Sequence, residues 1–480
     1  MDKIVQKLQE NYMKIIIKIC NGGMKMQINK DVFRSYDIRG IVGKDINEDF
    51  ALLLGKSFGS YIQNEKKDTI IVGHDCRESS PMLKEALVKG LISTGVNVID
   101  IGMATTPMVY FARKFLNVGP AIQITASHNP AEYNGFKMCI KKDEESIYGT
   151  KIEELYDFTI KGNFKNGNGK VEKKEVLDNY IDEICKRVKL GDRKLKVVAD
   201  CGNATASIVT EKLFKKLGVE VIPLYCDINP NFPNHHPDPS VPENLKDLCK
   251  KVQEVGADVG FGFDGDGDRI GVVDEKGDVI FGDLYMLIIW RDIIKNYPNS
   301  KALVEVKCSQ SLWDELEKIG AKPEFIRTGN PYIKAAMKEK NIPFSGEMSG
   351  HIFFRDEYYG FDDASYAAAR LLRILSNTDK KTSQLLDGIN KYYTTPEVGY
   401  TVDDEIKFDI IEKAAKYFID KGYKVVDVDG ARVIFDNGWG LIRASNTSPK
   451  ITLRFEAKTK EDLEKIQKGF EHVLEDIRKK

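Results

Sequence analysis

Three aspartates alternate with glycines in the run Asp264-Gly265-Asp266-Gly267-Asp268-Arg269. Glycine permits a tight curl of the backbone, so the three carboxylates are predicted to converge on one point. Like charges that converge need a cation, and ligation by oxygen alone favours Mg²⁺. Three protein ligands would leave the ion positions for a phosphate oxygen.

A calcium-binding loop is the alternative for this run, because Asp-x-Asp-x-Asp also opens an EF-hand and Glu275 stands at the twelfth position. The sixth position is Arg269, where that loop requires glycine, and the flanking segments have the composition of strands. An EF-hand has helices there, so the sequence favours the Mg²⁺ interpretation.

A possible nucleophile stands in the stretch Gln123-Ile124-Thr125-Ala126-Ser127-His128-Asn129-Pro130. Pro130 disfavours helical dihedral angles at Asn129, and the residues before Ser127 are typical of a buried strand. Ser127 is therefore predicted on a sharp loop at the end of a strand. A Ser-His pair is by itself weak evidence for an activated nucleophile, because neighbours in sequence rarely share a hydrogen bond. The alternative is that Ser127 is an ordinary serine in a turn.

Two further stretches could bind a sugar phosphate. Alternation along Gly346–His351 predicts that Glu347, Ser349 and His351 lie on one side of an extended segment, where they could contact sugar hydroxyls. Arg443 precedes Ser445, Asn446 and Thr447, and a guanidinium beside successive backbone N–H groups suits a phosphate dianion. A polar loop between strands and a surface turn are the respective alternatives.

The elements around these stretches alternate between strands and helices. Strands are predicted at 69–73, 96–101 and 120–125, with helices at 81–93 and 107–115 between them. Two more α/β units follow an Asn/Gly/Lys-rich linker at 161–170. The pattern changes after Tyr393, where a hairpin (432–435 and 439–444), a strand at 451–455 and helices at 408–419 and 460–477 are predicted. Alternation of this kind predicts sheets covered on both faces, with ligands beyond the carboxyl ends of the strands.

Composition excludes several classes of protein. The 480 residues carry 72 basic and 73 acidic side chains, a net charge of −1, so no attraction to nucleic acid or a membrane surface is expected. The eight cysteines are scattered singly, which indicates neither a disulfide framework nor a zinc site and favours the cytoplasm. His235 and His236 are adjacent and are interpreted as part of a structural loop. The run around Ile15–Ile17 is too short to span a membrane.

The stretches around Ser127, Asp264, Glu347 and Arg443, in this order over most of the chain, resemble the α-D-phosphohexomutase superfamily. Gly346–His351 and the run Asn231–Pro239 are most similar to bacterial phosphomannomutase/phosphoglucomutase enzymes. The resemblance implies an α/β protein with three similar mixed-sheet α/β domains and a smaller C-terminal α+β domain, heart-shaped around a central cleft. The domains expected are a disordered extension (1–27), a catalytic-serine domain (28–172), a metal-loop domain (173–278), a sugar-loop domain (279–392) and a phosphate-loop domain (393–480).

The resemblance also implies roles for individual residues. Ser127 would be phosphorylated, and its phosphate would share Mg²⁺ with Asp264, Asp266 and Asp268. The remaining residues fall into two sets. Lys137, Arg39 and His128 would act with Ser127 in catalysis, and the substrate would contact Tyr36, Arg269, Thr328, Gly329, Asn330, Glu347, Ser349, His351, Arg443, Ser445, Asn446 and Thr447. Asn330 departs from the family, which usually has His after Thr-Gly.

The implied activity interconverts hexose 6-phosphate and hexose 1-phosphate of mannose or glucose, through a phosphoserine and a hexose 1,6-bisphosphate that also serves as activator. Sugar phosphates are the only partners expected, with no nucleic acid and no membrane, and the protein is expected to be a monomer or weak dimer. Phosphoglucosamine mutase is an alternative, although that group usually has Gln in place of Met348. A non-catalytic sugar-phosphate sensor is disfavoured by the intact serine and aspartates. A phosphatase is disfavoured because closure of the cleft would exclude water.

Overall fold

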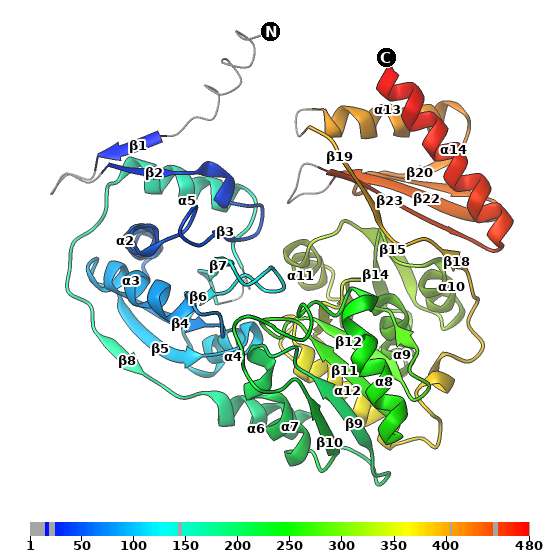
Figure 1. Cartoon of the computed structure of the whole chain (residues 1–480), viewed down its shortest axis with the longest axis horizontal. Coiled ribbons are helices and arrows are strands. Elements are labelled where there is room, and N and C mark those ends of the chain that lie inside the picture. The colour runs from blue at the N-terminus through cyan, green and yellow to red at the C-terminus, as the bar shows by residue number, and fades with distance from the viewer. Residues whose placement is uncertain (1–14, 19–24, 143–145, 404–405, 445–449, 480) are drawn as a thin grey trace. The chain divides into compact units, whose positions relative to one another are not determined.

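The structure is a computed structural model that describes residues 15–18, 25–142, 146–403, 406–444 and 450–479. Its chain, drawn in Figure 1, divides into two compact units. The first comprises residues 1–182 with 202–208 and 225–237, and the second comprises 183–201, 209–224 and 238–480. No described helix has the length and apolar character needed to cross a membrane.

The first unit contains a six-stranded mixed sheet in the order β3-β7-β6-β4-β5-β8. The strands β4, β5, β6 and β8 run parallel, and β7 pairs antiparallel with β6 and β3. The bounds of the strands are β3 (Ile38–Ile41), β4 (Thr69–His74), β5 (Asn97–Met103), β6 (Ala121–Ile124), β7 (Tyr133–Cys139) and β8 (Val171–Lys173).

Four helices accompany this sheet, α2 (Glu48–Asn64), α3 (Ser80–Ile92), α4 (Thr106–Phe115) and α5 (Thr150–Lys161). Gly55 and Gly90 let α2 and α3 approach closely, because a Cβ at either residue would lie 2.2 Å from a backbone oxygen of the other helix. The core between them and the sheet is built from apolar residues such as Phe58, Leu87 and Phe136. The parallel strands β4, β5 and β6 are largely buried, whereas β8 at the edge of the sheet is exposed. Their carboxyl ends lie at one edge of the sheet.

Two segments of the first unit differ from expectation. Residues 15–18 (β1) and 25–28 (β2) form an antiparallel pair, so disorder is the wrong prediction for the described part of the N-terminal extension. The predicted linker is held against the sheet domain, since Gly167 and Gly169 donate backbone hydrogen bonds to Ser93 and Ile92. A Cβ at Gly169 would lie 1.9 Å from the Val96 oxygen, which shows how closely this segment packs.

The second unit begins with a five-stranded sheet in the order β10-β9-β11-β12-β13. Its strands are β9 (Lys196–Asp200), β10 (Glu220–Leu224), β11 (Val259–Phe263), β12 (Ile270–Asp274) and β13 (Val279–Ile280). The helices in this part of the chain are α6 (Leu177–Arg187), whose first residues belong to the first unit, α7 (Thr210–Lys216) and α8 (Lys246–Val255). A 3₁₀ turn at Thr205–Ile208 precedes α7.

The next part of the second unit has a parallel pair, β14 (Lys301–Glu305) and β15 (Lys322–Ile326), and a hairpin, β16 (Phe344–Gly346) and β17 (Ile352–Phe354). Its helices are α9 (Gly282–Ile293), α10 (Gln310–Lys318), α11 (Asn330–Glu339) and α12 (Ala364–Ser376). α9 is apolar nearly all round and is almost entirely buried.

The C-terminal part has an antiparallel sheet in the order β18-β23-β22-β21-β20, with β19 also paired to β23. The helices α13 (Lys407–Asp420) and α14 (Lys460–Lys479) pack on this sheet and bury a shared core (Figure 1). The strands are β18 (Tyr393–Thr394), β19 (Val398–Thr401), β20 (Lys424–Val426), β21 (Ala431–Phe435), β22 (Gly438–Ala444) and β23 (Lys450–Ala457). The hairpin predicted over 432–435 and 439–444 is confirmed as β21–β22.

Candidate active site

Ser127 lies on a loop three residues after β6 ends, as predicted. Its φ angle is 51°, a left-handed conformation that non-glycine residues rarely adopt and that is common at functional sites. The Ser127 N–H donates to Thr125 Oγ1 over 2.8 Å, which holds the turn. Ser127 Oγ lies 3.2 Å from His128 Nδ1, so these neighbours do share a hydrogen bond, contrary to expectation.

Arg77 holds this loop and was not singled out from the sequence. The buried guanidinium donates hydrogen bonds to four loop carbonyls, those of Ser127, Asn129, Pro130 and Tyr133, over 2.6–3.1 Å. Asp75 pairs with its Nε at 3.1 Å and supplies the counter-charge. Because backbone carbonyls occur at every residue, no residue type marks them as acceptors of Arg77. The only sequence signal was the polar run His74-Asp75-Cys76-Arg77 at the end of β4.

Phe232, from the Asn231–Pro239 run, lies over the Arg77 guanidinium with its ring centre 5.4 Å away. Cys76 and Thr205 also connect this region, through a 3.0 Å hydrogen bond from the Cys76 N–H to Thr205 Oγ1. Residues 202–208 and 225–237 therefore belong structurally with the serine loop. His235 makes a hydrogen bond through Nδ1 to the His236 carbonyl, which agrees with a structural loop.

Arg39 and Lys137 lie on one face of the first sheet. Arg39 on β3 is opposite Gly135 on β7, two residues before Lys137, and alternate residues share a face. Arg39 donates to Asn129 Oδ1 at 2.9 Å and pairs with Asp37 at 2.6 Å, which joins it to the serine loop. Tyr36 is half-buried in the turn before β3.

The three aspartates occupy a tight turn between the antiparallel strands β11 and β12. All three are fully buried, and their ligand oxygens lie within 4.8 Å of one another. Asp264 Oδ1 accepts from the N–H groups of Asp268 and Arg269, and Gly267 has a φ of 74°. Strands flank the turn and Glu275 accepts hydrogen bonds from Ser383, so the EF-hand alternative is wrong. This oxygen-only donor set fits a hard divalent cation.

The metal turn is bonded to the predicted sugar-binding stretch. Arg269 and His351 form a β-bridge, and the Ile270 N–H donates to the Gly350 carbonyl at 3.0 Å. Gly350 has a φ of 93°, and a Cβ there would lie 2.4 Å from the Ile270 oxygen. The two backbones are therefore in direct contact and form one body.

Residues 347–351 do not form the extended segment predicted. They form the turn of the β16–β17 hairpin, closed by hydrogen bonds from the Glu347 N–H to the His351 carbonyl and from the Gly350 N–H to the Glu347 carbonyl. Glu347 and His351 are brought together because they face each other across the hairpin, while Ser349 is half-buried in the turn. The alternation argument fails because Gly350, with its positive φ, allows the chain to reverse.

His351 connects two charged groups. Its Nε2 accepts from Arg269 Nε at 2.9 Å, and its Nδ1 lies 2.9 Å from Asp362 Oδ2. Burial opposes the charged form of Arg269, but the surrounding carboxylates, with Asp238 and Asp264 foremost, raise its pKa. Asp268, His351 and Asp362 also lie close enough to hold an ion, yet His351 already accepts from Arg269.

The Thr328–Asn330 segment meets this hairpin. The Gly329 N–H donates to Glu347 Oε1 at 2.7 Å, and Asn330 Nδ2 lies 3.3 Å from Asp362 Oδ2. Burial raises the pKa of Glu347, and His351 opposes the rise. Thr328 Oγ1 donates to Glu305 Oε1 at 2.7 Å, so the segment is anchored at each of its three residues.

Arg443 lies near the end of β22 and is paired with Asp429, whose Oδ2 is 3.0 Å from Nη2. Ser445, Asn446 and Thr447 lie outside the described residues. Lys307 is another cation of this region that the sequence did not reveal, paired with Glu305 at 3.3 Å and Glu397 at 3.5 Å. Burial alone would lower the pKa of Lys307, but Glu305 and Glu397 outweigh it and raise the pKa.

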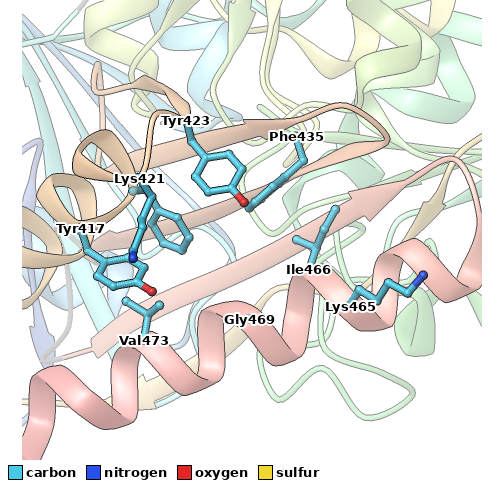
Figure 2. A pocket seen from close by; sticks show the side chains of 9 residues that line it. Tyr417, Lys421, Tyr423, Phe435, Lys465, Ile466, Gly469 and Val473 are labelled. Carbon is cyan, nitrogen blue, oxygen red and sulfur yellow. The ribbon is translucent and has the colours of Figure 1, made fainter.

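A separate pocket of about 400 Å³ lies between α13 and α14 (Figure 2). Aromatic rings and two lysines line it, but none of its lining residues belongs to the predicted site. The full lining is Tyr417, Phe418, Lys421, Tyr423, Phe435, Lys465, Ile466, Gly469 and Val473.

Comparison with known proteins agrees with this arrangement. The sequence matches four domain families in order, those of phosphoglucomutase/phosphomannomutase α/β/α domain I (residues 30–165), domain II (178–277), domain III (281–392) and the C-terminal domain (401–473). These four matches together span most of the chain.

Full-length relatives show the same similarity. A phosphomannomutase/phosphoglucomutase of Pseudomonas putida is 43% identical over 444 residues, 92% of this chain and 95% of that protein. A phosphoglucomutase of Neisseria gonorrhoeae is 40% identical over 452 residues, 93% of this chain and 97% of that protein. A crystal structure of a phosphoglucomutase/phosphomannomutase family protein from Burkholderia thailandensis matches with a TM-score of 0.87 and 39% identity, over 94% of this chain and 98% of that one.

Proposed function

The chain belongs to the phosphoglucomutase/phosphomannomutase family of the α-D-phosphohexomutase superfamily and is a hexose phosphate mutase, and we propose that it transfers its phosphoryl group through Ser127. The substrates would be glucose and mannose phosphates, interconverted between their 1- and 6-phosphates. One observation carries the proposal for the reaction centre. The buried three-carboxylate turn and the Glu347–His351 hairpin form one body, which puts a cation site beside groups that can bind sugar hydroxyls.

In the proposed reaction, phosphorylated Ser127 gives its phosphoryl group to the free hydroxyl of a hexose phosphate. The serine O–P bond breaks, a P–O bond to the sugar forms, and the hydroxyl proton passes to a base, for which Lys137 is the candidate. The resulting hexose 1,6-bisphosphate turns around and returns its other phosphate to Ser127. Added bisphosphate would also phosphorylate the resting enzyme and so act as activator.

The chain's own residues would supply position and charge, which is what phosphoryl transfer chiefly needs. The carboxylates Asp264, Asp266 and Asp268, with the phosphate of Ser127, would hold Mg²⁺. When bound, the ion would neutralise charge on the transferred group. Arg269 would add a fixed positive charge, His128 and Arg39 would orient the serine loop, and Tyr36 would contact the sugar.

The remaining residues would hold the substrate. Glu347 and His351 can accept or donate hydrogen bonds to hydroxyls, and Ser349, Thr328, Gly329 and Asn330 lie in the same turn or next to it. Arg443 would bind the phosphate that is not being transferred, together with Ser445, Asn446 and Thr447. Because either end of the sugar would occupy this position in turn, a charged site suits it better than a shape-specific pocket.

The test uses the purified full chain with glucose 1,6-bisphosphate and Mg²⁺. Coupled assays would compare glucose 1-phosphate, mannose 1-phosphate and glucosamine 1-phosphate, and we expect turnover of the first two to exceed that of the third. Intact-mass measurement and peptide mapping should find one phosphate, on Ser127. A phosphate on another residue, or a preference for the amino sugar, would contradict the proposal.

A further inference from the structure

Asp429 is a nearly buried carboxylate that the reaction above does not use. Its Oδ2 lies 3.1 Å from Arg443 Nε, 3.0 Å from Arg443 Nη2 and 3.1 Å from the Thr328 backbone nitrogen. The side chains of Arg443 and Asp429 are only 8% and 10% exposed. A single oxygen therefore joins the arginine of the C-terminal sheet to the segment that leads to Asn330.

The backbone beside Asp429 packs closely against β22. Gly430, the next residue, has a φ of 84°, and a Cβ there would lie 2.2 Å from the Ile442 oxygen and 2.7 Å from Arg443 Cβ. The turn before β21 thus lies directly on β22 at Arg443. This close approach holds the backbone of Asp429 beside Arg443, and the hydrogen bonds of Oδ2 to Arg443 and Thr328 hold the side chain there.

The charges nearby explain why a carboxylate is needed. Lys307 is also buried, and Arg443 is close enough to oppose its positive charge. Two neighbouring buried cations require counter-charges, because an unpaired buried charge is costly. Glu305 and Glu397 neutralise Lys307, and Asp429 does the same for Arg443.

A carboxylate commonly accepts hydrogen bonds from the Nε–Nη2 edge of an arginine. The orientation of the guanidinium is then fixed, and so is the direction in which its other N–H groups point. We propose that Asp429 is a positioning residue for Arg443, which sets the guanidinium for the non-transferred phosphate and keeps it in register with the Thr328–Asn330 segment. This inference rests on the proposed role of Arg443. The new element is that Asp429 couples the phosphate contact of Arg443 to the sugar contacts of the Thr328–Asn330 segment.

A substitution of Asp429 should weaken substrate binding more than it slows turnover, because the non-transferred phosphate stays in place while the other end of the sugar reacts. Interactions that are equal in the bound substrate and the transition state change KM and leave kcat alone. Asp429→Asn keeps the shape of the side chain and removes its charge. We expect it to raise KM for glucose 1-phosphate, and the inhibition constant of inorganic phosphate, by about fivefold to tenfold, as for one charge-assisted hydrogen bond. We expect kcat to stay within about twofold of wild type.

The decisive measurement is a double-mutant cycle with Arg443→Met. If Asp429 acts through Arg443, Asp429→Asn should change KM by less than about twofold once the guanidinium is gone. Asp427→Asn, at an exposed residue of the same turn, is the matched control and should leave KM unchanged. Asp429→Glu, which keeps the charge, should have a lower KM than Asp429→Asn, and thermal unfolding of each variant would identify any loss of folded protein.

Four results would overturn the inference. Asp429→Asn could leave KM unchanged, or could lower it, which would show that Asp429 competes with phosphate for Arg443. The KM of Asp429→Glu could be as high as that of Asp429→Asn, or Asp429→Asn could raise KM just as much in the Arg443→Met background. Failure of the proposed function gives a different result. In that case the wild-type protein itself would lack turnover of glucose 1-phosphate and mannose 1-phosphate.

Discussion

The serine loop and the metal turn are held in place by different means. In the serine loop, one buried side chain, Arg77, reaches four carbonyls and fixes a backbone with a left-handed residue. In the metal turn, the backbone of Ile270 lies against Gly350, and main-chain hydrogen bonds supply the framework. A side-chain substitution can therefore loosen the serine loop, whereas the metal turn should respond mainly to changes of its ligands.

The largest effect is expected from Ser127→Ala. The substitution removes the oxygen that would carry the phosphoryl group but keeps the Cβ and the Arg77 contacts, which go to backbone carbonyls. We expect turnover to fall by at least about a thousandfold, with an unfolding temperature close to that of wild type. Intact-mass measurement should find no phosphate on the variant, and turnover near the wild-type rate would end the phosphoserine proposal.

Asp266→Asn should have the next largest effect, because it reduces the carboxylates of the metal turn from three to two. We expect the Mg²⁺ concentration for half-maximal activity to rise by at least about tenfold, with a smaller change in KM for the sugar phosphate. Asp264 is a poorer choice, since it also accepts two backbone hydrogen bonds of the turn. Full activity of Asp266→Asn at low Mg²⁺ would exclude it as a ligand.

Arg77→Lys tests the difference between the two loops directly. Lysine keeps the charge beside Asp75 but cannot reach four carbonyls at once, so the serine loop should lose its fixed conformation. We expect kcat to fall by about tenfold to a hundredfold, with KM changed less.

Arg113→Lys is the matched control for this prediction. Arg113 is equally buried in the same unit and also donates to backbone carbonyls, those of Gly119 and Lys141. Both variants should unfold at a lower temperature, but only Arg77→Lys should lose kcat in the protein that remains folded. An equal loss of kcat in both would show that Arg77 contributes stability alone.

Local patterns predicted much of this molecule. The strand before Ser127, the convergence of the three aspartates and the β21–β22 hairpin follow from short-range sequence signals, and the structure confirms them. The four-domain α/β and α+β architecture is confirmed by the domain matches. In each case the residues that set the conformation lie within a few positions of one another.

Contacts between distant residues were not predictable in the same way. Arg77 contacts carbonyls some fifty residues away, and Asp429 contacts a backbone nitrogen 101 residues away. Backbone acceptors and donors are the same at every residue, so no residue type signals them. The Glu347–His351 turn was missed for another reason. Alternation along five residues does not distinguish a strand from a chain reversal, which the positive φ of Gly350 allows here.

The smallest effect is expected at Asn330, where the family usually has His. The amide lies 3.3 Å from Asp362, the carboxylate that also faces His351, and Asn330 is the first residue of α11. An amide can bind a hydroxyl or a phosphate oxygen but cannot shuttle protons near neutral pH as an imidazole can. A loose, metaphosphate-like transition state asks little of a general base, which favours a binding role for this position. We therefore expect Asn330→His to change kcat by well under about tenfold and to leave the pH profile of kcat in place. A large, pH-dependent gain in kcat would show instead that a residue at this position can transfer a proton. Lys137 or His351 would then perform the proton transfer in the natural chain.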